Sequence, residues 1–233
     1  MFINYAHRGA SHYCPENTML SFYTGVYMGA NGIETDVRKT KDGVLVLYHD
    51  DTLKAKTGAD GSVSDYTFEE LKKLRVTRGD FADSIVAFED FLAHFCDFDL
   101  TFAIEIKEEH IEKEIAELIR RYEMEEKVVV TSFGFSNLER MHIVAPELRL
   151  GYLTGKTGVG LAENMKANGI FEICPKSDLI DEAFVEKWHG DGFNVRAWGI
   201  KDLDDMKRVY DAGADGMTVN FPNKLKEYID SKN

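Results

Sequence analysis

Short runs of apolar and β-branched residues recur along the second half of the chain at a regular interval. Their starts lie between 21 and 27 residues apart, which suits one strand followed by one helix. The runs begin at Thr101, Val128, Arg149, Ile170, Phe193 and Asp215. Helix-like patterns fill the intervals, so the alternation predicts parallel strands joined by right-handed helical crossovers.

The first half of the chain adds two more strand and helix units. Residues 2–7 and 32–38 have strand composition, with a helix predicted at about 16–29 between them. Residues 44–49 follow a Lys-Asp-Gly turn and are predicted to pair with the preceding strand as a hairpin. Eight units in all predict a closed (β/α)₈ TIM barrel. An open doubly wound sheet is the alternative, although the first strand-to-helix turn lacks its GxGxxG fingerprint.

One stretch breaks the period, and several polar residues mark helix starts. We expect residues 50–90 to form a small insertion on one face of the barrel, after the hairpin. Residues 67–70 and 136–139 both have the form of a capping box. Asp181 and Asp202 are predicted to cap the helices that follow them.

The composition is that of an ordinary globular protein, and no linker divides it. The chain has 233 residues, of which 44% are hydrophobic and 30% charged. We therefore expect one domain spanning 1–233. Three cysteines without CxxC spacing argue against a disulfide framework or a structural zinc site. Neither a signal peptide nor an apolar run long enough to span a membrane is visible, so the expected location is cytoplasmic.

The charge balance limits the kinds of partner. Asp and Glu number 41 against 28 Lys and Arg, giving a formal net charge of −13. Such a field repels nucleic acid and anionic membranes, so neither is an expected partner. One small anionic substrate stays possible, because a local cation or metal ion can invert the field inside a cleft. The oligomeric state is not readable from these features.

Polar residues stand where the predicted strands end, which is where barrels of this type carry their chemistry. Glu34 and Asp36 are two residues apart and therefore share one face of their strand. Glu105 and Lys107 have the same spacing on a later strand. A single charge at a strand end is usually just solvated, but burying three carboxylates together is costly without a cation. The pattern predicts a hard divalent metal ion on the three carboxylates.

The remaining polar residues at the strand ends suit phosphate chemistry. Arg8 and Lys107 supply a bidentate donor and a point charge for a phosphate group. His7 and His49 each end a predicted β segment and can give and take protons near neutral pH. Together these residues predict a metal-dependent enzyme acting on a phosphate ester.

Six short motifs strengthen this interpretation. In chain order they are His7-Arg8-Gly9, Pro15-Glu16-Asn17-Thr18, Ile33-Glu34-Thr35-Asp36-Val37, Thr40-Lys41-Asp42-Gly43, His49-Asp50 and Ile104-Glu105-Ile106-Lys107. In sequence and spacing they resemble the glycerophosphodiester phosphodiesterases. Weaker similarity continues at Ser132-Phe133, Trp198 and Asp215-Gly216, so the resemblance spans nearly the whole chain.

The resemblance implies a (β/α)₈ barrel with a small insertion and a bound Mg²⁺ or Ca²⁺. It also implies hydrolysis of small glycerophosphodiesters to glycerol 3-phosphate and an alcohol. The implied roles are acid/base catalysis by His7 and His49, phosphate binding by Arg8 and Lys107, and metal binding by Glu34, Asp36 and Glu105. Trp198 and Phe133 are further candidates for substrate contact, and each is equally suited to packing on the core.

The chain departs from the family pattern at four places. They are Ala55-Lys56-Thr57 for Arg-Thr-Thr, Val86-Ala87-Phe88 for Pro-Thr-Leu, Trp198-Gly199-Ile200 for Trp-Thr-Val, and Thr218-Val219-Asn220-Phe221-Pro222 for Thr-Asp-x-Pro. None removes an implied catalytic or metal residue, so they bear on substrate preference.

Two other functions compete with this one. The first is a phospholipase-like activity on lysophospholipids or phosphoinositides, and the second is a silent barrel that senses a phosphorylated metabolite. Mere binding needs no proton shuttle, so the two histidines argue against the sensor. The mostly polar insertion favours deacylated substrates. No activated Ser or Cys stands beside a His, so we expect attack by the substrate's own hydroxyl, with His49 as acid and His7 as base as the working hypothesis.

Overall fold

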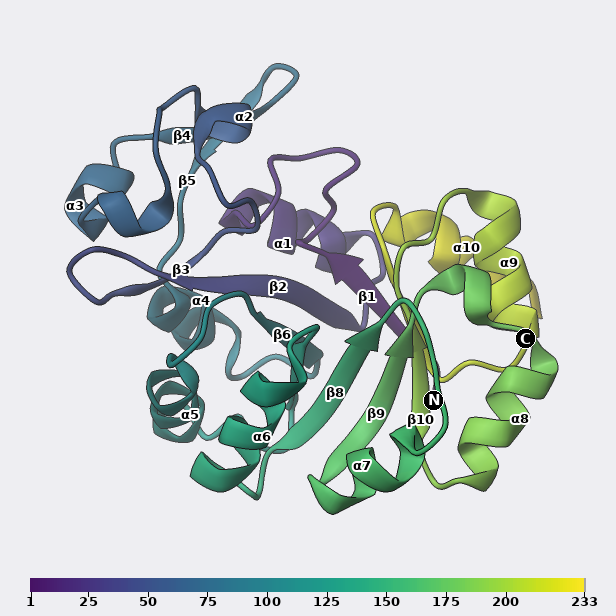
Figure 1. Cartoon of the computed structure of the whole chain (residues 1–233). Coiled ribbons are helices and arrows are strands. Elements are labelled where there is room, and N and C mark those ends of the chain that lie inside the picture. The colour runs from purple at the N-terminus through teal and green to yellow at the C-terminus, as the bar shows by residue number, and fades with distance from the viewer. Residues whose placement is uncertain (233) are drawn as a thin grey trace.

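The computed structural model describes residues 1–232, and within them eight parallel strands close into the predicted (β/α)₈ barrel. The strands are β1 (Ile3–His7), β2 (Gly32–Lys39), β6 (Thr101–Ile106), β7 (Val128–Ser132), β8 (Arg149–Thr154), β9 (Ile170–Pro175), β10 (Asn194–Ala197) and β11 (Gly216–Val219). Because β1 pairs with both β2 and β11, the sheet closes on itself (Figure 1). The open-sheet alternative is therefore wrong.

Helices surround the barrel, and their starts follow local capping chemistry. They are α1 (Met19–Tyr27), α4 (Phe88–Phe95), α5 (Glu112–Arg121), α6 (Phe135–Val144), α7 (Leu161–Ala167), the 3₁₀ helix η2 (Ser177–Leu179), α8 (Glu182–Gly190), α9 (Leu203–Asp211) and α10 (Pro222–Lys232). The carboxylate of Asp181 accepts the backbone N–H of Phe184, and Asp202 accepts those of Asp204 and Asp205. Both predicted caps are confirmed.

The first helix begins later than predicted. We placed it at 16–29, but α1 starts at Met19, with Thr18 as its cap accepting the backbone N–H of Ser21. Asn17 has a φ of +56°, a left-handed conformation that cannot continue into a helix. The residues between the end of β1 at His7 and the cap Thr18 therefore form a loop at the C-terminal ends of the strands.

The helix after β7 also starts differently. Residues 136–139 do not form a capping box, because α6 already begins at Phe135 behind the unbonded cap Gly134. The hydroxyl of Ser132, at the end of β7, accepts the backbone N–H of Gly134 instead. A turn closed by Ser132, two residues before Gly134, thus replaces the cap that the sequence suggested.

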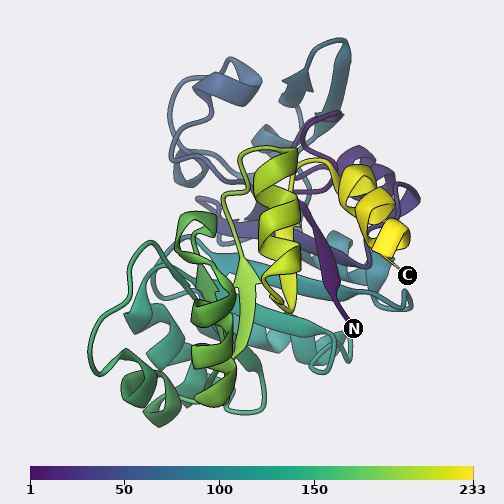
Figure 2. The ribbon, with the colours of Figure 1, turned by 90° about the vertical axis from the view of Figure 1, so that its right-hand side faces the viewer.

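The hairpin and insertion occur as a unit beside the barrel. Strand β3 (Leu45–Leu47) pairs antiparallel with β2, as predicted. Beyond it come α2 (Lys54–Thr57), the 3₁₀ helix η1 (Val63–Asp65), α3 (Phe68–Leu71), β4 (Arg75–Arg78) and β5 (Phe81–Ser84). Figures 1 and 2 show α2, β4 and β5 standing apart from the barrel on one side. The capping box at residues 67–70 is confirmed at the start of α3.

The predicted insertion boundary needs a correction at its C-terminal end. We placed the insertion at 50–90, but α4 begins at Phe88 and belongs to the barrel wall. Phe88 and Phe91 are fully buried in the main hydrophobic core. The insertion has a small core of its own, which includes Leu53 and Leu71. The irregular segment therefore ends just before Phe88.

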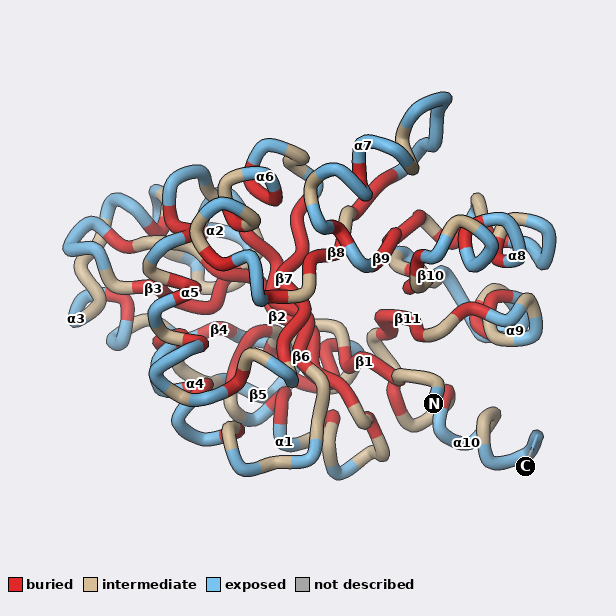
Figure 3. Tube along the Cα trace, turned by 90° about the horizontal axis from the view of Figure 1, so that it is seen from below, coloured by how far each residue is buried: buried red, intermediate tan, exposed pale blue. Residues whose placement is uncertain are grey.

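The main core lies between the strands and the surrounding helices. In Figure 3 the buried segments converge on the strands, and the exposed segments lie on the outer sides of the helices. Among residues 1–232, no helix has both the length and the apolar character that crossing a bilayer requires. The interior of the barrel differs from the usual apolar filling, because Glu34, Glu105, Thr131 and Arg196 are all buried and line one pocket. That pocket opens at the C-terminal ends of the strands.

Candidate active site

A pocket of about 310 Å³ descends into the barrel from the C-terminal ends of the strands. Residues predicted for the site make up much of its lining: His7, Arg8, Glu34, His49, Glu105, Lys107, Phe133 and Trp198. The remaining predicted residue, Asp36, is fully buried behind them. The barrel thus gathers residues that lie as far apart as 7 and 198 in the sequence.

Three carboxylates form one compact group. Glu34 and Asp36 both come from β2, and the register pairs Asp36 with Glu105 on the neighbouring strand β6. One oxygen from each of the three lies within 4.8 Å of the others, and all three residues are buried. Carboxylate oxygens in this number are the ligands that hard divalent ions prefer.

Electrostatics within this group also fit a cation. Burial and the charge of Asp36 raise the pKa of Glu34 to about 8, and the same two causes raise that of Glu105 to about 7. Burial opposes the charge of Asp36 as well, but nearby Arg8 and Lys107 hold its pKa well below its usual range. One Asp36 oxygen, Oδ1, accepts no hydrogen bond and is paired with the charge of Lys107 at 3.3 Å. The crowded, partly unsatisfied carboxylates are the donor set that a metal ion requires.

Two basic side chains sit directly against these carboxylates. Arg8 Nε is 3.1 Å from Asp36 Oδ2, and Arg8 Nη1 is 2.9 Å from the carboxylate of Glu16. Lys107 Nζ is 2.6 Å from Glu105 and 3.3 Å from the other oxygen of Asp36. With all three carboxylates ionised, as they would be around a metal ion, they and these two cations would leave one negative charge, and a bound phosphodiester would add another. A divalent cation would neutralise both.

Asn17 holds Asp36 in place, a role the sequence did not reveal. Its amide nitrogen donates to Asp36 Oδ2 at 2.9 Å, and its amide oxygen accepts the hydroxyl of Thr35 at 2.7 Å. The left-handed backbone at Asn17 turns its amide toward β2. Asparagine tolerates this conformation better than most residues. The only sequence signal was its place in the Pro-Glu-Asn-Thr motif.

His7 ends β1 and lies between a carboxylate and an amide. Its Nδ1 is 2.5 Å from the side-chain oxygen of Asn220, and its Nε2 is 3.9 Å from Glu34. Burial, followed by the positive charge of Arg8, lowers the pKa of His7 to about 4. The ring is therefore neutral at physiological pH and can accept a proton.

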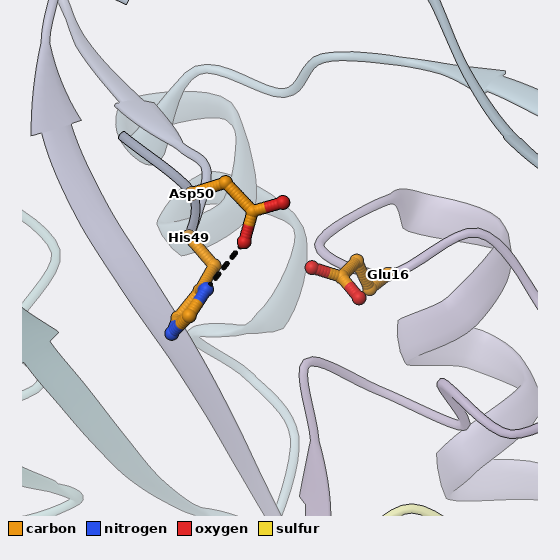
Figure 4. A group of neighbouring side chains, drawn as sticks. All are labelled: Glu16, His49 and Asp50. Atoms are coloured by element: carbon orange, nitrogen blue, oxygen red, sulfur yellow. Dashed lines mark hydrogen bonds and ion pairs between the residues drawn. The ribbon is translucent and has the colours of Figure 1, made fainter. Parts of the chain in front are cut away.

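His49 follows β3 and has a different partner. Its Nδ1 donates to the carboxylate of Asp50 at 2.7 Å (Figure 4). Arg38, two residues beyond Asp36 on β2, donates from Nε and Nη2 to the His49 carbonyl at 3.1 and 2.8 Å. Arg38 continues the alternation of Glu34 and Asp36, a signal that sequence reasoning missed.

Glu16, His49 and Asp50 also have potential metal-ligating atoms within 4.8 Å of one another (Figure 4). Their charges are already paired, however. Glu16 contacts Arg8, and its other oxygen is 2.7 Å from Lys56 Nζ in the insertion. These groups therefore form an ion-pair network that links the insertion to the pocket. Lys56 lies within one of the departures from the family pattern.

Two aromatic rings line the pocket on another side. Phe133 follows β7 and Trp198 follows β10, with ring centroids 5.0 Å apart and planes nearly perpendicular. The indole N–H donates to the carbonyl oxygens of Cys174 and Thr154, at 3.0 and 3.3 Å. Phe133 is 45% exposed, whereas the Trp198 ring is held by these bonds. Both rings remain available to a ligand in the pocket.

A buried arginine forms part of the lining, and sequence reasoning missed it. Arg196 on β10 is 1% exposed, and it donates to Glu172, Thr218 and Cys174. Gly151 on β8 makes room for this group, because a Cβ there would lie 3.1 Å from the Glu172 carboxylate. The sequence shows Arg196 only as one charge in a short strand, and its partners come from three other positions in the barrel.

Gly9 is the residue that lets the first loop pass close to α1. Its φ is +80°, and a Cβ would lie 2.4 Å from the backbone carbon of Ser21. We expect Gly9→Ala to lower the free energy of unfolding by about 3 kcal/mol or more, from left-handed strain plus overpacking. Gly58→Ala is the matched control, with a φ of +79° and nothing within 4 Å. It should cost about 1 kcal/mol in urea unfolding, and equal losses for the two variants would contradict the packing argument.

Comparison with known proteins gives one consistent result. A family model for the glycerophosphoryl diester phosphodiesterase family matches residues 7–224. A glycerophosphodiester phosphodiesterase from Caldanaerobacter subterraneus subsp. tengcongensis is 34% identical over 239 residues, covering 94% of each chain.

Solved structures share the fold. The crystal structure of a glycerophosphodiester phosphodiesterase from Agrobacterium tumefaciens has a TM-score of 0.85 at 23% identity, covering 97% of this chain and 100% of that one. A phosphodiesterase from Oleispira antarctica, solved with its product sn-glycerol-3-phosphate, also has a TM-score of 0.85. It is 24% identical and covers 97% of this chain and 96% of that one.

Proposed function

Because the chain belongs to the glycerophosphoryl diester phosphodiesterase family, we propose that it hydrolyses glycerophosphodiesters to glycerol 3-phosphate and an alcohol. The observation that carries this proposal is the content of the pocket. Two histidines, two basic side chains and two carboxylates line one cavity of about 310 Å³, and the third carboxylate, Asp36, is buried against these two. The product bound to the Oleispira antarctica enzyme supports the same substrate class.

Glu34, Asp36 and Glu105 would hold the divalent ion, either Mg²⁺ or Ca²⁺. The fit rests on their proximity and their burial. When bound, such an ion stabilises the negative charge that develops on a phosphate group during hydrolysis. Asn17 keeps Asp36 oriented, so the carboxylate group is preformed on two adjacent strands.

Arg8 and Lys107 bind the phosphate in this proposal. Both line the pocket, and each is anchored by a carboxylate on one side, which fixes its charge near the carboxylate group. Arginine supplies paired N–H donors, and lysine supplies a compact charge. Phe133 and Trp198 would contact the glycerol or the alcohol part of the substrate.

The two histidines transfer protons in this proposal. Their hydrogen-bond partners suggest which one acts as the base and which as the acid. His7 is neutral at physiological pH beside Arg8, so its free Nε2 can accept a proton. His49 donates from Nδ1 to the Asp50 carboxylate, which orients the ring, and we assign to it the role of proton donor. His7 would act as base and His49 as acid, protonating the departing alcohol.

The nucleophile in this proposal comes from the substrate. Within the described part of the chain, the pocket lining contains no serine or cysteine. A glycerol hydroxyl next to the phosphodiester could attack phosphorus once His7 removes its proton. Such an intramolecular attack benefits from a very high effective concentration. Water would then open the cyclic phosphate, with the roles of the two histidines reversed.

The test is a panel of glycerophosphodiesters, each assayed with and without Mg²⁺ or Ca²⁺ for release of glycerol 3-phosphate. We expect ion-dependent release from at least one deacylated substrate. A lysophospholipid in the same panel addresses the phospholipase-like alternative, for which release of lysophosphatidic acid would be the sign. Binding of these compounds without any turnover would overturn the proposed function in favour of a sensor.

Lys107 should contribute mainly to the transition state. Lys107→Met keeps the length of the side chain and removes the charge next to Glu105 and Asp36. We expect kcat/KM to fall by about 10²-fold, since one lost electrostatic donor can cost about 3 kcal/mol. Lys113→Met, at an exposed position on α5, is the control and should leave kcat/KM unchanged. A Lys107→Met activity within twofold of the wild type would mean that Lys107 does not meet the phosphate.

A further inference from the structure

Asn220 follows β11 and lies directly against one of the two histidines. Its side-chain oxygen is 2.5 Å from His7 Nδ1 and also accepts the hydroxyl of Ser11 at 3.0 Å. Its backbone carbonyl accepts the N–H of His12 at 3.0 Å. The last strand and the loop after the first strand are therefore joined around a single amide group.

The chemistry of the ring decides which way this amide must face. If the amide nitrogen pointed at His7, Nδ1 would have to act as an acceptor. A ring that takes up a proton during the reaction has N–H donors at both nitrogens, so it then needs an acceptor at that position. Only the oxygen of Asn220 satisfies both the neutral and the protonated ring. The Ser11 hydroxyl donates to the same oxygen and so anchors the amide group beside the ring.

We propose that Asn220 is a positioning residue that holds His7 in the Nδ1–H tautomer, leaving Nε2 free to accept the proton. The proposal rests on the proposed function of this pocket, and it adds a residue with no role in that mechanism so far. Nε2 is the nitrogen on the Glu34 side, 3.9 Å from that carboxylate. The proton acceptor therefore faces the group that would hold the metal ion.

An amide at this position holds the ring without adding charge. Three carboxylates already lie within 4.8 Å of one another at this pocket. Glu34 and Glu105 line it, and Asp36 is buried beside them. A neutral oxygen fixes the ring without adding a further negative charge next to them. His49 lies farther along the chain, after β3, and there a carboxylate, Asp50, makes the corresponding contact. Both rings thus donate a hydrogen bond from Nδ1, His7 to a neutral oxygen and His49 to a charged one.

The first test reads the tautomer directly in the unmodified protein. With ¹⁵N-labelled histidine, the ring nitrogens of His7 can be assigned by comparison with His7→Gln. We expect Nδ1 to carry the proton at pH 7 in the wild type. A protonated Nε2 with a bare Nδ1 would overturn the proposal. This measurement needs no substrate, so its failure is distinguishable from a failure of the proposed function.

The second test compares two substitutions at Asn220. Asn220→Leu removes the acceptor at similar size, and we expect kcat to fall by about 10²-fold or more while KM changes less than threefold. Loss of the correct tautomer costs up to about 10⁴-fold in a serine protease. Asn220→Asp restores an acceptor and should give a kcat at least tenfold above that of Asn220→Leu. Ser11→Ala, which removes only the bond that anchors the amide, should show a smaller loss of kcat.

Measuring how tightly each variant binds glycerol 3-phosphate distinguishes structural damage from loss of positioning. We expect Asn220→Leu to bind glycerol 3-phosphate as tightly as the wild type and to give a mixture of His7 tautomers. Equal loss of kcat and binding in both Asn220 variants would indicate a structural role and overturn the proposal. If Asn220→Leu does not fold, the wild-type spectrum and the Ser11→Ala kinetics still decide the question.

Discussion

Chelation of divalent ions is expected to abolish turnover, and Mg²⁺ or Ca²⁺ to restore it. The reason is the group of Glu34, Asp36 and Glu105, whose buried oxygens lie within 4.8 Å of one another. Binding of the ion to the folded state alone should also raise the Tm. At an ion concentration 100 times Kd, mass action adds about 2.7 kcal/mol to the stability.

The variants for this prediction separate site binding from general ion effects. Glu34→Gln keeps the shape of the side chain and removes one negative charge, so it should lose both the activity and most of the ion-dependent rise in Tm. Glu109→Gln removes one exposed carboxylate outside the pocket and should retain both. Full activity in excess EDTA after dialysis would refute the metal requirement.

Local and periodic features were the predictable part of this protein. The interval between apolar runs gave the barrel, because each strand and helix pair has a nearly fixed length. Spacing of two residues put Glu34 beside Asp36 on one face of β2, and a parallel barrel brings neighbouring strand ends together. The carboxylate group could therefore be predicted before any coordinates.

Contacts that join distant segments were not predictable in this way. Arg196 looked like one charge in a short strand, yet it is buried and paired with Glu172 from the adjacent strand β9. Asn220 could be noted only as a departure from the family pattern, because its contact with His7 spans 213 positions. The capping box at residues 136–139 failed for a different, local reason: α6 begins at Phe135, and Ser132 accepts the backbone N–H of Gly134. For Arg196 and Asn220 a partner far away in the sequence decided the structure.

The attacking group can be tested with the substrate as well as with the protein. If the glycerol hydroxyl beside the phosphodiester is the nucleophile, an analogue with hydrogen in its place should bind the pocket without being cleaved. Binding should persist because Arg8 and Lys107, together with the ion that the carboxylate group would hold, would contact the phosphate. A competition assay measures binding, and release of the alcohol measures cleavage. Normal turnover of the deoxy analogue would show that water attacks phosphorus directly.

Both histidines should be required for turnover. The His7 variant should lose the general base, and the His49 variant should lose the general acid. His7→Ala and His49→Ala should each lose about 10³-fold or more in kcat, since general acid or base catalysis contributes typically 10²–10⁴-fold. A substrate whose alcohol is already a good leaving group needs less help from an acid, so it should rescue His49→Ala and not His7→Ala. His94→Ala, at an exposed position on α4, is the control and should keep full activity. Rescue of His7→Ala alone by that substrate would reverse the two assignments, because the acid would then be the ring held by Asn220.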